Sequence, residues 1–449
     1  MLGTTVGDGV RVAVVGSGIS GLSAALYLER AGFEVDVIER DDRLGGRFGV
    51  AKLGDRPVMM GGKNIGRKYS AFRAFMDTLG TFEWEPFGIN TSFMKEDEVL
   101  PVDSHKRSRS LASIAKLATP RDLARLAAMA TRIQRDESNK FLGSKYFTEI
   151  SREHDHEPLS AFFSEKTVDS LLRPLTVRMN GAEPDDVYPG TFGTNLALVL
   201  DFYDQLKDGV QPALEAFERR VNVRCNTVVQ SLVVRGGRTT GLLVSQDGGP
   251  VEELEYAGVV VATPAYAAAE ILREEMPGLS KRLTDVRYNP SSVMLVEYDR
   301  PVFTTEIRAL AMHDGGPCSN AGSYGMNDRH IVRYTFSGRG AQGRELSPEQ
   351  LDIWVGEAEQ RLTRYLSATR AKPLQRVGKN WPAAYSAYLP YHGEFLADVR
   401  HAVDALPGLE LSGDYLWGVS IEACTRAGNA AGTRLTEHLT SYSYAGARR

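Results

Sequence analysis

Residues 11–21 read Arg-Val-Ala-Val-Val-Gly-Ser-Gly-Ile-Ser-Gly, and this stretch decides how the chain begins to fold. Its first five residues are mostly apolar and β-branched, which is typical of a buried parallel strand, and the run stops at Gly16. A helical pattern follows as far as Gly32, and Glu34–Ile38 has the pattern of a second strand. The stretch therefore predicts a strand–helix–strand unit.

Three glycines lie between the first strand and the helix. Gly16, Gly18 and Gly21 have the spacing G-x-G-x-x-G. The first permits a tight turn, the second lets the backbone approach a pyrophosphate, and the third allows the helix to pack closely on the strand. The first N–H groups of the helix would then face the phosphates. Glu39 ends the second strand about 20 residues on, where a carboxylate can accept hydrogen bonds from adenosine ribose hydroxyls. Alone it would also suit a solvated strand end, but the combination predicts a dinucleotide site.

A second glycine pair follows this unit. Glu39-Arg40 leads into Arg-Leu-Gly-Gly-Arg at 43–47. The pair would bring the backbone close to a ligand, and Arg47 can pair with a phosphate. The alternative is a glycine turn with a surface arginine. Arg40, Gly46 and Arg47 are accordingly candidate cofactor-binding residues.

The segment 12–47 resembles the N-terminal signature of the flavin amine oxidase, protoporphyrinogen oxidase and phytoene desaturase superfamily of FAD-dependent oxidoreductases. Two further segments share the resemblance. Met-Gly-Gly-Lys-Asn-Ile at 60–65 is similar to the strand and glycine pair beside the flavin, and Leu-Glu-Leu-Ser-Gly-Asp-Tyr at 409–415 is similar to the C-terminal flavin motif. The resemblance implies FAD held without a covalent bond, because the tethering cysteine of amine oxidases is not found upstream of Gly413. Cys424 follows the motif and is expected to be a small buried hydrophobe.

The same resemblance assigns more residues to the cofactor. Asp414 would lie near the ribityl or pyrophosphate region. Ile421 begins a helix whose first N–H groups would face the pyrimidine oxygen, by the same helix-terminus effect as above. The residues assigned on this basis are Gly61, Gly62, Val228, Gly413, Asp414 and Ile421.

The expected fold class is α/β, with a discontinuous Rossmann-type FAD-binding domain and a second, α+β, substrate-binding domain. Strands at 258–262 and 409–411 would join the first sheet, and a helix is expected from about 422 to 439. We assign 1–80, 208–286 and 395–449 to the FAD-binding domain, and 81–207 and 287–394 to the substrate-binding domain. Within the latter, 110–180 look mostly helical, whereas 287–390 are rich in Tyr, Ser and β-branched residues.

Candidate catalytic residues come from the neighbourhood of these motifs. An aromatic concentration suits a pocket for a flat or apolar substrate, although core packing explains any single member more economically. Its members are Trp381, Tyr385, Tyr388, Tyr391 and Trp417. Lys63 follows the second glycine pair, where a cation would stabilise the reduced flavin. The alternatives for Lys63 are a surface lysine or a phosphate contact. We take Lys63, Trp381 and Tyr385 as the catalytic candidates.

Residues 110–135 predict a basic amphipathic helix. Its apolar positions at helical spacing are Leu123, Leu126, Ala127, Ala130 and Ile133. A domain helix with a solvated face is the favoured interpretation, a substrate entrance is an alternative, and peripheral membrane contact is a less favoured one.

Composition limits the remaining classes of function. A formal net charge of −4 argues against a nucleic-acid binder, and three widely separated cysteines indicate neither a disulfide framework nor zinc. His154 and His156 lack further spaced ligands, so no metal is assigned. No signal-peptide pattern or apolar run of membrane-spanning length is found, and the cytoplasm is the expected location. The number of subunits stays open.

The expected reaction is hydride removal from an activated C–H bond of a small or medium-sized, largely apolar substrate to flavin N5. Dioxygen is the expected reoxidant, because one dinucleotide fingerprint is found and hence no evident site for a nicotinamide. Amine oxidation and desaturation both fit. The alternatives are a redox-neutral flavin-dependent isomerase or mutase, and a non-catalytic flavin-binding protein.

Overall fold

The computed structural model describes residues 9–87, 90–95, 98–103, 106–312, 316–341, 347–366 and 371–446. The first unit forms as predicted, with β1 (Arg11–Val15), α1 (Ile19–Arg30) and β2 (Glu34–Ile38). Val12, Ala13 and Val14 are fully buried, as a strand covered on both faces requires.

Segments from the start, middle and end of the chain join β1 in one parallel sheet. Its order is β10 (Asn222–Arg224), β2, β1, β14 (Gly258–Val261) and β20 (Leu409–Leu411). Val12 pairs with Val35 on one side and with Gly258 on the other, and Val259 pairs with Leu409. The predicted discontinuous Rossmann-type sheet is therefore confirmed, with β10 as an unpredicted edge strand.

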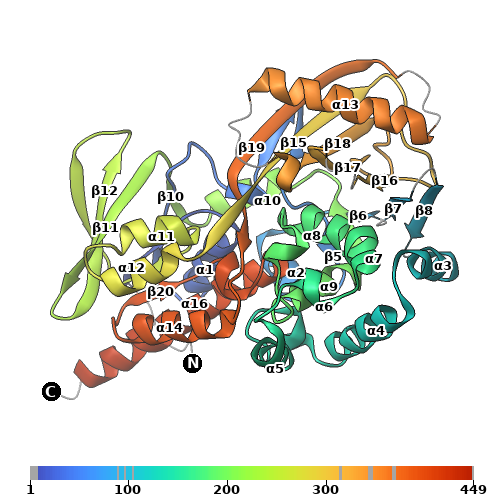
Figure 1. Cartoon of the computed structure of the whole chain (residues 1–449). Coiled ribbons are helices and arrows are strands. Elements are labelled where there is room, and N and C mark those ends of the chain that lie inside the picture. The colour runs from blue at the N-terminus through green and yellow to red at the C-terminus, as the bar shows by residue number, and fades with distance from the viewer. Residues whose placement is uncertain are drawn as a thin grey trace.

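Both faces of this sheet are covered, because alternate residues of β1 enter different cores. Val12 and Val14 pack with α1, α2 (Ser70–Leu79), α10 (Gln211–Glu218) and α16 (Ile421–Gly446). Ala13 and Val15 pack with α11 (Ala265–Ile271), α12 (Pro277–Thr284), α14 (His392–Asp404) and an antiparallel sheet of β11 (Thr227–Arg235), β12 (Arg238–Gln246) and β13 (Val251–Glu255). Figure 1 shows α1 and α16 side by side.

A second, seven-stranded sheet draws on both remaining sequence blocks. Its order is β19 (Pro373–Ala387), β15 (Arg287–Tyr298), β18 (Ile331–Phe336), β17 (Cys318–Ser323), β16 (Ala309–Ala311), β7 (Asn90–Lys95) and β8 (Glu98–Asp103). The helix α13 (Pro348–Leu366) covers it, with Trp354 packed on Phe336 at 5.5 Å between ring centroids (Figure 1). The domain boundaries given above stay a prediction.

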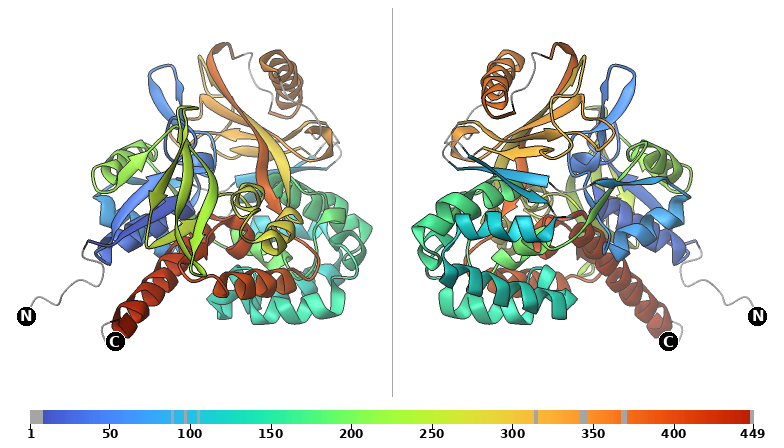
Figure 2. Two further views of the ribbon diagram at one scale, coloured as in Figure 1. Left: turned by 90° about the vertical axis from the view of Figure 1, so that its left-hand side faces the viewer. Right: turned by 90° about the vertical axis from the view of Figure 1, so that its right-hand side faces the viewer.

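Helices fill most of 107–199, below the second sheet (Figure 2). They are α3 (Arg107–Leu117), α4 (Pro120–Arg135), α5 (Lys145–His154), α6 (Leu159–Phe162), α7 (Glu165–Thr167), η3 (Val168–Leu172), α8 (Arg173–Asn180) and α9 (Phe192–Val199). The expectation of a single helix over 110–135 is corrected by the structure, because two helices, α3 and α4, form there. Thr119 caps α4 by accepting a hydrogen bond from the Asp122 amide, and Pro120 occupies its first turn. A proline has no N–H to continue the preceding helix.

Short strands connect the two parts. β3 (Val50–Leu53) and β4 (Arg56–Met59) form a hairpin, whereas β5 (Ile65–Gly66), β9 (Tyr203–Leu206) and β6 (Trp84–Phe87) form a small sheet. Leu53 and Val58 of the hairpin share a core with Val293 and Leu295 of β15. This contact joins the segment after Arg47 to the second sheet.

Candidate active site

The first glycine turn has the geometry that its spacing predicts. Gly16 adopts φ +95°, in the left-handed region that favours glycine, and its N–H donates to the Ile38 carbonyl at 2.8 Å. A Cβ at Gly21 would overlap the Gly16 carbonyl oxygen, whereas a Cβ at Gly18 would meet no heavy atom within 4 Å. Gly21 therefore allows helix packing, and Gly18 leaves room for a ligand at the N-terminus of α1.

The Glu39 carboxylate is buried beside this turn. Its Oε2 accepts from the Ser17 amide at 2.8 Å and from the Ser17 hydroxyl, and its Oε1 accepts from the Asp41 amide at 2.9 Å. Arg40 is exposed and pairs with Asp41, and Val228 is 43% exposed on β11. Neither Arg40 nor Val228 is brought to the cavity described below.

The second glycine turn joins the first turn to the C-terminal motif. A Cβ at Gly46 would lie 3.5 Å from the Cα of Gly18, so the two turns approach closely. Arg47 donates through Nη1 to Asp414 at 2.7 Å and to the Ala384 carbonyl at 2.8 Å. Burial opposes the charge on Arg47, but the carboxylate of Asp414 more than compensates and raises the Arg47 pKa. The alternative of a surface arginine does not describe Arg47.

One large cavity, of about 1050 Å³, runs beside these motifs. Residues from all three motif segments line it, among them Gly18, Gly45, Arg47, Gly61, Gly62, Gly413, Asp414 and Ile421. Gly62 faces the Ile421 side chain, which an added Cβ would meet at 3.3 Å. Gly16, Gly21 and Gly46 support the turns from outside the lining.

The residues at this end of the cavity fit FAD. Open space at Gly18 admits a pyrophosphate, and the N-terminus of α1 offers N–H groups toward it. Two polar atoms of lining residues, Thr263 Oγ1 and Asn64 Oδ1, are buried without a hydrogen-bond partner in the described part of the chain. A buried polar atom without a partner is costly, so both atoms suit a polar ligand.

Lys63 lies within the structure rather than on its surface, with 6% of its area exposed. Its Nζ donates to Gln205 Oε1 at 2.8 Å and to the Tyr324 carbonyl, and lies 4.0 Å from the centre of the Phe87 ring. Burial and the positive charge of Arg333 lower the pKa of Lys63 well below its ordinary value. Lys63 lines the cavity next to Gly62.

The aromatic concentration divides into two groups. Trp381 and Tyr385 of β19 line the cavity. The hydroxyl of Tyr388 lies 3.5 Å from the Asp414 carbonyl, the Tyr391 amide donates to Asp155 at 3.0 Å, and Trp417 packs on Phe141. Tyr388, Tyr391 and Trp417 therefore make contacts that stabilise the fold.

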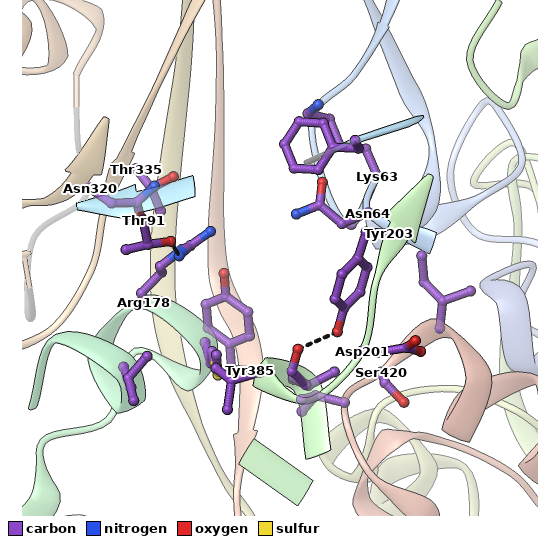
Figure 3. A pocket seen from close by; sticks show the side chains of 18 of the residues that line it. Lys63, Asn64, Thr91, Arg178, Asp201, Tyr203, Asn320, Thr335, Tyr385 and Ser420 are labelled. Carbon is purple, nitrogen blue, oxygen red and sulfur yellow. Dashed lines mark hydrogen bonds between the residues drawn. The ribbon is translucent and has the colours of Figure 1, made fainter. Parts of the chain in front are cut away.

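Sequence reasoning missed several cavity residues. Tyr69 and Tyr203 meet edge to face at 6.1 Å between ring centroids. Arg178 of α8 and Arg333 of β18 also line the cavity. Figure 3 shows Thr91, Arg178, Asn320 and Thr335 on one side of it, Tyr385 in the middle, and Lys63, Asn64 and Tyr203 on the other side. Tyr69, Tyr203, Arg178 and Arg333 come from segments without a motif, and no local pattern could have found them.

The apolar face of α4 points inward. Leu123, Leu126, Ala127 and Ala130 line the cavity, and Ile133 is in the helical core. Leu111 of α3 also lines it while 67% exposed, so this end of the cavity reaches the surface. These positions support the alternative that the helix over 110–135 lines a substrate entrance.

Other predictions concern metal, cysteines and membranes. Among the described residues, no three His, Cys, Asp or Glu side chains are grouped to hold a metal ion. Cys424 is buried at the cavity wall, and burial raises its pKa to about 12. No helix in the described ranges combines the length and apolarity needed to cross a bilayer. Non-covalent binding and the cytoplasmic location stay predictions.

Comparisons with known proteins point in one direction. The family model described as "Flavin containing amine oxidoreductase" matches residues 19–436. A probable flavin-containing monoamine oxidase A of Dictyostelium discoideum is 26% identical, over 76% of this chain and 77% of its own. A coproporphyrinogen III oxidase of Mycobacterium bovis is 24% identical, over 95% of this chain and 97% of its own.

Solved structures share the fold. The cyclohexylamine oxidase of Brevibacterium oxydans superposes with a TM-score of 0.75, covering 96% of this chain and 99% of that one, at 16% identity. At this identity the likeness concerns the arrangement of the chain, and it covers both the parallel sheet and the second sheet.

Proposed function

The chain belongs to the family of flavin-containing amine oxidoreductases and is an FAD-dependent oxidoreductase, and we propose that it oxidises an activated C–H bond of a small or medium-sized substrate. The proposed product carries a new C=N or C=C bond. The proposed electron acceptor is dioxygen, which would leave as hydrogen peroxide after taking up two electrons and two protons.

The continuity of the cavity is the observation that supports this proposal best. The space beside Gly18 and Arg47 continues past Gly61 and Gly62 to an apolar chamber between α4 and the second sheet. Leu123, Leu126, Leu171, Leu172 and Leu175 line that chamber. A substrate there would lie in the same enclosed space as the cofactor, which is the proximity that direct oxidation requires.

Bound FAD supplies the two-electron acceptor, and the chain supplies position and charge. We assign Trp381 and Tyr385 as walls that orient the substrate. Lys63 is assigned to stabilise negative charge developing beside Gly62, and that negative charge would favour the protonated form of Lys63, which burial and Arg333 disfavour. Its hydrogen bonds to Gln205 and Tyr324 hold the Nζ atom in a fixed place, so it needs no rearrangement during the reaction.

Anaerobic single-turnover measurements test the proposal. The holoenzyme is mixed without oxygen with polyamines, amino acids, porphyrinogens and polyenes in turn, and flavin absorbance is followed. The true substrate should bleach the flavin in one turnover, and deuterium at the oxidised carbon should slow that step. Readmitted oxygen should restore the colour and yield one hydrogen peroxide per product.

Variants of the wall test the assigned roles. Tyr385→Phe, Trp381→Leu and Lys63→Met should slow bleaching more than they weaken FAD binding. Tyr391→Phe is a matched control, because Tyr391 is an aromatic residue outside the cavity lining. Product formed without flavin reduction and without any acceptor would contradict oxidation and establish a redox-neutral isomerase. A protein that cannot be loaded with FAD would contradict the whole assignment.

A further inference from the structure

The charges that line the cavity do not balance. Two arginines are accounted for by carboxylates, since Arg47 pairs with Asp414 at 2.7 Å and Arg308 lies 3.7 Å from Asp103. Arg178 and Arg333 also line the cavity, yet neither forms an ion pair with any carboxylate of the described residues. Both arginines are only partly exposed. Charges withdrawn from bulk water are ordinarily paired, so this pair of arginines needs an explanation.

The contacts of the two guanidinium groups leave most of their donors unused. Arg178 donates through Nη1 to the Thr91 hydroxyl, and Arg333 donates through Nη1 to the Gly61 carbonyl at 2.8 Å. A guanidinium group has five N–H donors. These two hydrogen bonds hold each arginine in place while leaving the remaining edge of the fork available to a ligand.

The electrostatic setting shows that the charge of Arg333 acts on Arg178. Burial lowers the pKa of Arg178, and so does the positive charge of Arg333; burial also lowers the pKa of Arg333. An arginine remains charged at neutral pH even so, because its ordinary pKa is far above that range. The two like charges therefore oppose each other at the cavity wall. A bound anion would relieve this repulsion.

We propose that Arg178 and Arg333 form a carboxylate-binding site, and that the substrate oxidised in this cavity is an amphipathic acid. This inference rests on the proposed oxidation of a substrate in the same cavity. A carboxylate matches the planar fork of arginine better than a spherical anion does. Thr91, Asn320 and Thr335 lie beside Arg178 in Figure 3 and add neutral polar groups at the same end. The leucines of α4 and η3 provide the apolar remainder of the site.

The two arginines come from other elements than the expected phosphate site. They belong to α8 and β18, whereas the first glycine turn and Arg47 belong to the segment that begins the chain, and Arg333 approaches the cofactor motifs through its hydrogen bond to Gly61. Asp201 is the cavity carboxylate for which no ion pair is found among the described residues, and it lies beside Ser420 in Figure 3, on the side away from Arg178. The anion-binding end of the cavity is thus the end at Arg178.

Binding measurements on the holoenzyme test the inference without any need for turnover. Straight-chain carboxylates of about four to ten carbons are compared by calorimetry with their amides, which have the same shape without the charge. Charge-assisted hydrogen bonds are the strong ones, so a carboxylate should bind at least about tenfold more tightly than its amide. Arg178→Met and Arg333→Met should each remove this preference, and Arg178→Lys should restore part of it.

Controls separate charge recognition from loss of structure. Arg287→Met removes an exposed arginine outside the lining and should change nothing. FAD content and the flavin spectrum should stay at the wild-type level in Arg178→Met, because a role confined to the cofactor would alter them. Equal affinity for acid and amide, or no binding by any acid, would overturn the inference. Acid binding with no flavin-bleaching substrate would instead count against the proposed oxidation and leave the carboxylate site standing.

Discussion

Gly18→Val should abolish FAD binding while leaving the apoprotein folded. Gly18 has φ −64° and ψ 168°, an extended conformation open to any L-residue, and its Cβ would meet no heavy atom within 4 Å. A Cβ at this position therefore adds no strain, and apoprotein stability should stay within about 1 kcal/mol of the wild type. The added methyl groups would occupy the space beside α1 that a pyrophosphate needs.

The magnitude follows from ligand linkage. Wild-type apoprotein in FAD at about 100 times its Kd should gain about 2.7 kcal/mol of unfolding free energy. If the substitution weakens binding at least about 100-fold, the variant gains no more than about 0.4 kcal/mol at the same concentration. Denaturant unfolding of the two apoproteins with and without FAD measures both quantities.

Gly21→Ala is the matched control, because its Cβ would overlap the Gly16 carbonyl. It should destabilise the apoprotein, which is the opposite pattern to Gly18→Val. A folded Gly18→Val apoprotein that gains the wild-type 2.7 kcal/mol, to within about 0.5, would show that the pyrophosphate lies elsewhere.

Three further outcomes are expected. Glu39→Ala should weaken FAD affinity only in part and should also lower apoprotein stability in urea, because the carboxylate already binds the Ser17 amide. Burial lowers the pKa of His392 to about 4 from 6.5, so the unfolded chain takes up the proton first and stability falls as the pH drops from about 6.5 to 4, by roughly 3 kcal/mol in all. Urea unfolding of His392→Gln should lack this slope, and an unchanged slope would assign it to other groups. Acid precipitation should release intact FAD from wild type and from Cys424→Ser alike, whereas flavin retained by wild type alone would reveal a covalent bond.

Local sequence was sufficient for the cofactor end of the molecule. The strand–helix–strand unit, the glycine turns and the two later flavin motifs depend on neighbouring residues, so their spacing predicted both the parallel sheet and the lining near Gly18. The break before Pro120 could also have been predicted, because Thr119 followed by Pro120 and by Asp122 three residues later is a helix-start pattern. The three-residue strand β10 is too short to have a pattern of its own.

The substrate end depends on tertiary contacts instead. Arg178 and Arg333 lie on α8 and β18, which are distant in sequence and meet only when the helical block packs under the second sheet. The same limit applies to Lys63, whose burial comes from Gln205, Tyr324 and Phe87. In the sequence Arg178, Arg333 and Lys63 look like ordinary basic residues. Only the fold distinguishes them from solvated ones.

The parallel sheet can be completed only late in translation, because its strands come from the start, middle and end of the chain. One edge of β1 pairs with β2 and the other with β14. Val12 therefore cannot pair with Gly258 until Gly258 has left the ribosome. At about 5–20 residues per second this takes roughly 12–50 s, and β20 arrives later still. During that time an apolar strand edge is open to other nascent chains, which is an aggregation hazard. The ion pair between Arg47 and Asp414 joins the N-terminal and C-terminal flavin motifs, and it cannot form before Asp414 has been synthesised. FAD binding is therefore expected at the end of translation or after it.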